Sequence, residues 1–268
     1  MKALFAVLLL LAAGMAEAGV PCTLVVDAAD GEVLHRDGPC DHRNSPASTF
    51  KVALVLAGYE TGILVDAKEP LWPYRDEYKS WDLDWKKKPT DPTSWLQDSV
   101  VWYSRLLVQK MGRRKVQNFV DAFDYGNRDL SGSIKFKETL PEAVWVDSTL
   151  RISPMEQVEF LRKLVNRQLP LQSETYDKAL AVIPTYPGPG GWTVHGKTGT
   201  GDQELTDHHQ YGWFVGWAEN GPRKIVFAIL IKDDAREETI AGVRARDQFI
   251  PTLPSLLVKA APTPKTSR

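Results

Sequence analysis

The sequence predicts a mixed α/β (α+β) fold, in which an antiparallel sheet is flanked by helices and joined to a helical lobe. Strand-like segments occur near both ends of the 268-residue chain, and helical periodicity fills the middle. Strands at both chain ends favour one sheet, in which an N-terminal hairpin joins the C-terminal strands. The middle of the chain would then form the helical lobe, with a cleft between the two.

The composition is that of an ordinary globular protein, with 43% hydrophobic and 25% charged residues. The formal net charge is −1, and no run of like charge exceeds three residues. Binding to nucleic acid or to an anionic membrane is therefore not expected.

Residues 1–18 have the pattern of a secretory signal peptide. Lys2 precedes an apolar run over 3–13, and Ala16-Glu17-Ala18 forms an A-x-A cleavage site. The apolar run is too short for a good membrane span, although an uncleaved anchor is the alternative. We expect export to the periplasm, one mature domain over 19–260 beginning at Gly19, and a flexible tail over 261–268.

Segments 23–27 and 32–36 read as two strands around a turn that contains Gly31. A hairpin centred there places Cys22 opposite Cys40, and these are the only two cysteines of the chain. Export permits a disulfide, and the register brings the pair within bridging distance. The alternative is a pair of buried free thiols.

Segment 45–58 contains Ser48 and Lys51, followed by apolar residues up to Gly58. This pattern predicts a helix that is buried on every face and capped by the glycine. Residues three apart share a helix face, so the lysine amine would lie next to the serine hydroxyl at the helix N-terminus. A weak nucleophile beside a base at such a position suits acyl transfer. An N-cap serine with a surface lysine is the plainer alternative.

The remaining elements follow from periodicity and capping signals. A polar, proline-rich and tryptophan-rich loop covers roughly 66–97. Ser153 and Glu156 form a capping box at the start of one helix, and Ser173 is expected to cap another. The prolines at 251 and 254 should bend or break the last helix. Helices are predicted over 97–111, 113–123, 154–167, 173–183 and 237–259, and strands over 192–196, 211–218 and 225–231.

Three short motifs follow in order along the chain. Ser99-Val100-Val101 lies at a helix start, Tyr125-Gly126-Asn127 in a helix-ending turn, and Lys197-Thr198-Gly199 at the end of a predicted strand. Each motif alone has a plain alternative, namely an N-cap, an ordinary turn and a strand end. Their order and placement together with the Ser48 motif are far more specific than any one of them.

With these motifs the chain resembles the class D (oxacillinase-type) serine β-lactamases. Trp145 and the stretches 46–51, 98–102, 150–153 and 212–217 also match, so the resemblance covers essentially the whole mature chain. The Ser-Asp-Asn motif of class A β-lactamases is missing, because Ser99-Val100-Val101 stands in its place. Glu138 and Glu142 lack the surroundings of the class A glutamate.

The resemblance implies that Ser48 is the nucleophile and that Lys51 is carbamylated by CO2. An amine in an apolar site has a depressed pKa, and only the neutral amine adds CO2 to give an anionic oxygen base. By the same resemblance Val101 borders the carbamate, and the Trp145 indole N–H donates to it. Ordinary core packing is the alternative for the tryptophan.

The other site residues are implied in the same way. Ser99 would relay a proton toward the leaving nitrogen. Lys197 would supply positive charge and, with Thr198 and Gly199 of the same motif, help to bind and orient the substrate carboxylate.

The backbone N–H groups of Ser48 and Thr200 would form the oxyanion hole. Arg244 is the residue expected to bind the β-lactam carboxylate, and Arg246 is its rival.

No metal or other cofactor is expected, apart from CO2 held as the carbamate. His195, His208 and His209 lack zinc-ligand spacing. The expected partner is a small β-lactam, without stable membrane insertion, and the protein would be a monomer or a homodimer. The alternative functions are a penicillin-recognising sensor or transpeptidase that is acylated without turnover, and a binding protein with an inactive site. The substrate spectrum would depend on loops around 85–97 and 200–210.

Overall fold

The computed structural model describes residues 22–80, 82–132, 149–203 and 209–257. The predicted signal peptide, the tail, Trp145 and His208 lie outside these residues. The strands are β1 Cys22–Asp27, β2 Val33–Asp37, β3 Thr185–Pro187, β4 Thr193–Asp202, β5 Gln210–Asn220 and β6 Arg223–Lys232. The α-helices are α1 Lys51–Glu60, α2 Pro92–Gln97, α3 Val101–Met111, α4 Arg113–Ala122, α5 Pro154–Val165, α6 Ser173–Val182 and α7 Ala241–Leu256, and short 3₁₀ turns include η1 Ala47–Phe50 and η3 Asp84–Lys86.

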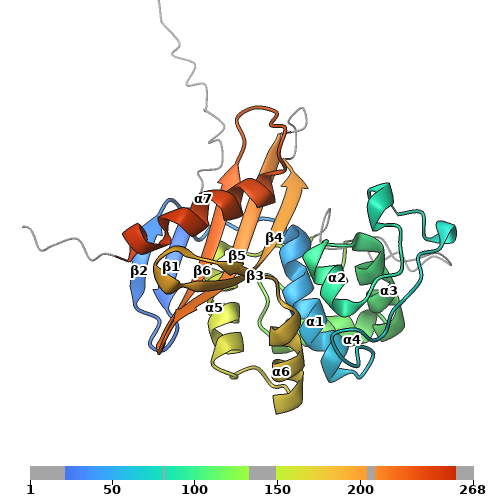
Figure 1. Ribbon diagram of the computed structural model, residues 1–268. Coiled ribbons are helices and arrows are strands. Elements are labelled where there is room, and N and C mark those ends of the chain that lie inside the picture. The colour runs from blue at the N-terminus through green and yellow to red at the C-terminus, as the bar shows by residue number, and fades with distance from the viewer. Residues whose placement is uncertain (1–21, 81, 133–148, 204–208, 258–268) are drawn as a thin grey trace, which may run out of the picture.

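In the described part of the chain, six strands form one antiparallel sheet in the order β2-β1-β6-β5-β4-β3 (Figure 1). The N-terminal hairpin joins the C-terminal strands through β1 and β6, where Leu24 lies opposite Ala228. The predicted mixed fold with one antiparallel sheet is confirmed. The short edge strand β3 was not predicted, since three residues containing a proline carry little strand signal.

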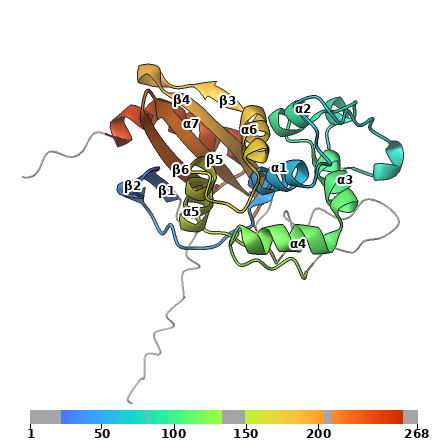
Figure 2. The same cartoon turned by 90° about the horizontal axis from the view of Figure 1, so that it is seen from below.

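The two faces of the sheet are covered by different helices. Side chains alternate along β5, so Trp213 and Val215 belong to one apolar cluster and Phe214 to another. Helix α7 packs on the second face, where Phe249 lies 4.4 Å from Phe227 between ring centroids. Helix α5 covers the first face, and α1 lies between the sheet and helices α2–α4 (Figures 1 and 2).

Cys22 and Cys40 are joined by a disulfide, which confirms the predicted bridge. The hairpin brings them together as expected, although a register shift between Val25 and Val26 marks an irregularity that the sequence did not reveal. The Cys40 carbonyl also accepts a hydrogen bond from the Met155 N–H at 3.0 Å. The bridge therefore ties the hairpin to the start of α5.

The predicted end of the Ser48 helix is wrong, because α1 runs through Gly58 to Glu60. A Cβ atom on Gly58 would lie 2.6 Å from Leu64, so this glycine is required for close packing rather than for helix termination. Gly62, two residues after the end of α1, has a left-handed backbone with φ +70°.

The single helix predicted over 97–111 is also wrong, since α2 and α3 are separated by a break at Ser99, whose φ is +55°. Helix α4 and the capping box of α5 agree with the prediction. Ser173 is the first residue of α6 rather than its cap. Helix α7 continues through Pro251 and Pro254 to Leu256, so the prolines do not break it.

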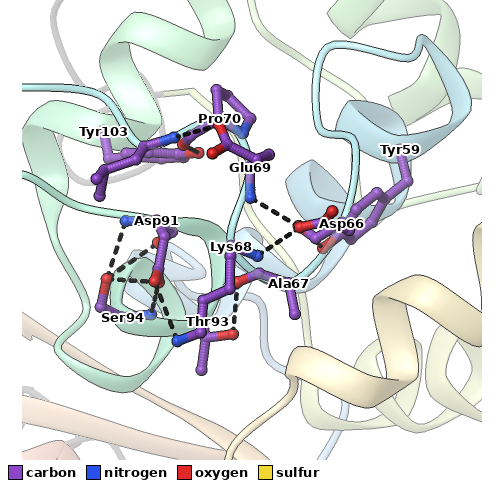
Figure 3. A network of polar contacts seen from close by, with 11 residues as sticks. Tyr59, Asp66, Ala67, Lys68, Glu69, Pro70, Asp91, Thr93, Ser94 and Tyr103 are labelled. Atoms are coloured by element: carbon purple, nitrogen blue, oxygen red, sulfur yellow. Dashed lines mark hydrogen bonds and ion pairs between the residues drawn. The ribbon is translucent and has the colours of Figure 1, made fainter.

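The long loop between α1 and α2 is ordered by hydrogen bonds to its own backbone and to the helices (Figure 3). Thr93 donates through its N–H and its hydroxyl to the Ala67 carbonyl. Asp91 caps α2, and the Tyr103 hydroxyl of α3 donates to the Pro70 carbonyl at 3.0 Å. These contacts hold the loop against the helical lobe. Across the described ranges, no helix combines the length and the apolar character needed to span a membrane.

Candidate active site

Ser48 lies in the 3₁₀ turn η1, directly before α1 and against strand β4. A Cβ atom on Gly199 of β4 would lie 3.2 Å from the Ser48 nitrogen and 3.1 Å from the Pro46 carbonyl oxygen. The glycine therefore lets the strand backbone approach the turn closely. Ala47, just before the serine, has a left-handed backbone with φ +45°. The turn is thus held in an unusual conformation at the position of the proposed nucleophile.

Lys51 begins α1, and its ammonium nitrogen lies 2.8 Å from the Ser48 hydroxyl oxygen. The side chain is fully buried, because nearly every residue of α1 is packed against the sheet or the helical lobe. Burial lowers the pKa of Lys51 to about 7. The negative charge of Asp82 raises this pKa, and the positive charge of Lys86 lowers it further. A large share of the amine is therefore neutral near pH 7.

Ser99 sits at the break between α2 and α3 and faces the second buried lysine. The Lys197 amine donates to the Ser99 hydroxyl at 3.1 Å and to the Thr198 carbonyl at 3.0 Å. The Val100 N–H donates to the Trp95 carbonyl at 3.0 Å, which fixes the break. The structure therefore brings the four predicted catalytic residues into two hydrogen-bonded serine–lysine pairs.

Lys197 and Lys51 are electrostatically coupled. Lys197 is 2% exposed, and burial followed by the charge of Lys51 lowers the pKa of Lys197 well below its usual value. Two ammonium groups in such a site repel each other, so the positive charge of one lysine lowers the pKa of the other.

The Lys-Thr-Gly motif was predicted at the end of a strand, and this prediction is wrong because the motif lies inside β4. The strand continues to Asp202 because it pairs with β5 over its whole length. The Thr200 hydroxyl accepts a hydrogen bond from the Gly242 N–H at 2.9 Å, and this contact joins β4 to the start of α7. The motif is thus held from both sides.

The Tyr-Gly-Asn motif packs against the Ser48 turn through Tyr125. The Gln157 amide donates to the Thr49 hydroxyl at 2.9 Å and to the Tyr125 hydroxyl at 3.4 Å. The ring centroids of Phe50 and Tyr125 lie 5.3 Å apart. Gln157, on α5, was not singled out in the sequence, because a buried glutamine inside an amphipathic helix leaves no pattern.

Asp82 was also missed. Its carboxylate is buried and accepts hydrogen bonds from the Val101 and Trp102 N–H groups at the start of α3. Val101, predicted to border the site, is therefore the first residue of a helix that a distant carboxylate caps. No local signal connects two positions that are 19 residues apart.

The two candidate arginines differ in their partners. The Arg244 guanidinium donates to both carboxylate oxygens of Asp233 at 2.6 Å. Arg246 lies over the ring of Tyr186, 5.1 Å from its centroid, and its charge contributes to lowering the pKa of Lys197. Arg244 is thus held through its Nη2 in an ion pair with Asp233, whereas Arg246 donates to Asp247 at 2.7 Å and its charge reaches the buried Lys197.

His195 takes a structural position beside the sheet. The His195 ring stacks on Trp217 at 4.9 Å, and its Nδ1 lies 3.0 Å from the Thr185 hydroxyl. Among the described residues there is no group of three or more His, Cys, Asp or Glu side chains that could hold a metal ion.

Comparison with known proteins places this arrangement in a family. The model of the penicillin binding protein transpeptidase domain matches residues 21–250. Over 241 residues the chain is 38% identical to β-lactamase OXA-9 of Klebsiella pneumoniae, covering 88% of each chain. It is 32% identical to β-lactamase OXA-1 of Escherichia coli over 240 residues, covering 88% of this chain and 84% of the relative. The crystal structure of the OXA-427 class D β-lactamase superposes with a TM-score of 0.78 at 39% identity, covering 89% and 98% of the two chains.

Proposed function

The chain belongs to the class D serine β-lactamases, and from that premise we propose that it hydrolyses β-lactams through an acyl-enzyme on Ser48, with a carbamate of Lys51 as general base. The observation that carries the proposal is the 2.8 Å hydrogen bond between the Ser48 hydroxyl and the buried Lys51 amine. A weak nucleophile requires an adjacent base, and the lowered pKa of this lysine makes it one.

In acylation, the Ser48 oxygen attacks the ring carbonyl and passes its proton to the group on Lys51. The backbone N–H groups of Ser48 and Thr200 are the proposed donors to the developing oxyanion. The close approach of β4 at Gly199 supports this assignment, because it brings the strand backbone beside the Ser48 nitrogen. Loss of one such donor typically lowers the rate on the order of 10²–10³-fold.

Release of the ring nitrogen requires a proton, which we assign to Ser99 in relay with Lys197. The 3.1 Å contact between the Lys197 amine and the Ser99 hydroxyl supports this role. Together with Thr198 and Gly199, Lys197 is also proposed to orient the substrate carboxylate. These three residues are consecutive on β4, beside the Ser48 turn.

The carbamate would form when the neutral Lys51 amine adds CO2 and loses a proton, and it would supply an anionic oxygen as the base. The surroundings of Lys51 suit a carbamate, because the amine is fully buried and burial holds its pKa at about 7. Val101, which is 9% exposed, is proposed to line the same site, and Trp145 is proposed to donate its indole N–H.

We further propose that residues 1–18 are removed on export to the periplasm and that 19–260 form a single domain. The disulfide between Cys22 and Cys40 supports an oxidising compartment. N-terminal sequencing of the exported protein should read from Gly19, and retention of Met1 would contradict the cleavage.

The first test is turnover. The purified protein should hydrolyse nitrocefin over many cycles, and Ser48→Ala should abolish both hydrolysis and covalent labelling by penicillin. Ser255→Ala, a matched change on the exposed face of α7, should leave both unchanged. Stoichiometric acylation without turnover would favour the sensor or transpeptidase alternative. Labelling that persists in Ser48→Ala would show that the nucleophile is misassigned.

The second test concerns the carbamate and pH. At pH 6, about one unit below the pKa of Lys51, only about a tenth of the amine is neutral. Activity should therefore fall after degassing at mildly acidic pH and recover when bicarbonate is added. With ¹³C-bicarbonate, NMR should show one carbamate resonance that is absent in Lys51→Ala. Trp145→Ala should require more bicarbonate for the same activity. Full activity in CO2-free buffer without such a resonance would reject the mechanism.

The third test separates the two arginines. Arg244→Ala should raise KM for carboxylate-bearing substrates more than it lowers kcat, if the arginine contributes mostly uniform binding. The same change leaves Asp233 buried without its cation, so thermal unfolding must be measured alongside kinetics. An unchanged KM in Arg244→Ala, with a raised KM in Arg246→Ala, would transfer the role to Arg246.

A further inference from the structure

Asp82 is a buried carboxylate beside the site, and neither the motifs nor the proposed reaction uses it. It lies within the α1–α2 loop, in a residue that is 6% exposed. Each of its two oxygens lies 3.0 Å from the Val101 nitrogen, and one lies 2.9 Å from the Trp102 nitrogen. The Ser80 hydroxyl donates to the same carboxylate at 2.7 Å. These donors hold the carboxylate firmly in one place.

The first consequence is structural. Helix α3 begins after Val100, which provides no side-chain cap, so its first N–H groups would otherwise be unsatisfied. Asp82 accepts from them across the chain and places a negative charge at the positive end of the helix. The start of α3 is directly connected to Ser99 of the site. Asp82 therefore fixes the position of the segment that contains Ser99 and Val101.

The second consequence is electrostatic. Burial is the largest influence on the pKa of Lys51 and lowers it, and Asp82 is the next largest and raises it. The third influence on the pKa of Lys51 is the positive charge of Lys86, which lowers it. The charges that act on Lys197 are cations, namely Lys51, Lys86 and Arg246. Asp82 therefore acts on one of the two buried lysines and helps to distinguish them.

We propose that Asp82 is a positioning residue of the reaction, whose negative charge keeps the carbamylation of Lys51 weak and reversible while its oxygens clamp the start of α3. The inference rests on the proposed carbamate mechanism. Carbamylation forms a bond between the amine nitrogen and the CO2 carbon, and a proton leaves the nitrogen for solvent. The lysine thereby changes from a cation or neutral amine to an anion.

The sign of the effect follows from this change of charge. A fixed carboxylate nearby stabilises the ammonium form of Lys51 and repels the carbamate anion. Both effects oppose carbamylation. Removal of the charge at Asp82 should therefore favour the carbamate, even though removal of a helix cap would by itself loosen the site. A charge effect and a purely structural effect thus predict opposite changes.

The test compares neutral variants at position 82 in the full-length enzyme. Asp82→Asn retains the shape, and Asp82→Ser offers a hydroxyl acceptor without an amide NH2 group facing backbone donors. The bicarbonate concentration that gives half of the ¹³C carbamate signal should fall about threefold or more at neutral pH, because loss of the negative charge at position 82 favours the carbamate anion. The acidic limb of the activity–pH profile should move to lower pH.

Asp91→Asn is the matched control. Asp91 caps α2 as Asp82 caps α3, accepting from the Ser94 N–H at 2.7 Å (Figure 3). Its charge acts on the hydroxyls of Tyr59 and Tyr103, whereas the charges that act on Lys51 are those of Asp82 and Lys86. This variant loses a charge and weakens a helix cap, and its bicarbonate requirement should equal that of the parent enzyme.

The outcomes separate this inference from the mechanism on which it rests. A parent enzyme that carries the carbamate, with neutral variants that require the same or more bicarbonate, would overturn the role of Asp82 and leave the mechanism intact. Failure of both neutral variants to fold would also overturn it, because Asp82 would then be needed for structure alone. A parent enzyme without the carbamate resonance would reject the mechanism itself.

Discussion

The site depends on the complete burial of one amine. Lys51 can act as a base near neutral pH only if its pKa is far below that of a solvated lysine. Its full burial disfavours the charged form and lowers the pKa to about 7. This burial requires α1 to be covered on all sides, by the sheet through η1 and by the helical lobe through α3, α4 and α6. The two-part architecture is thus the means by which an ionisable group is placed in an apolar environment.

Close backbone packing is the second requirement, because a buried amine is useful only if substrate carbonyls meet the Ser48 turn. Glycines on β4, β5 and α7 allow this approach. A Cβ atom on Gly212 would lie 2.2 Å from the Ala241 carbonyl carbon, and one on Gly242 would lie 2.5 Å from the Gly199 carbonyl oxygen. Helix α7, strand β5 and strand β4 are therefore packed backbone to backbone. Any larger residue at these positions would move β4 relative to Ser48.

The sequence was informative where the determining interactions are local. Three-residue spacing placed Lys51 beside Ser48, and the hairpin register placed Cys22 opposite Cys40. The predictions from the sequence were wrong where residues distant in the chain determine the structure. The break at Ser99 is stabilised by a cap from Asp82, and the Lys-Thr-Gly motif lies inside a strand because β5 pairs beyond it. Neither partner is close in the chain, so periodicity predicted a continuous helix and an early strand end.

The electrostatics of the two lysines connects these features. In the unmodified site, Lys51 and Lys197 are both buried, and each positive charge disfavours the other. A carbamate on Lys51 would replace the repelling cation by an anion, and the same proximity would then favour the protonated form of Lys197. A proton donor for the Lys197–Ser99 pair and a base beside Ser48 would thus arise in one step. In its proposed role Asp82 opposes that step, and its negative charge raises the CO2 concentration that the site requires.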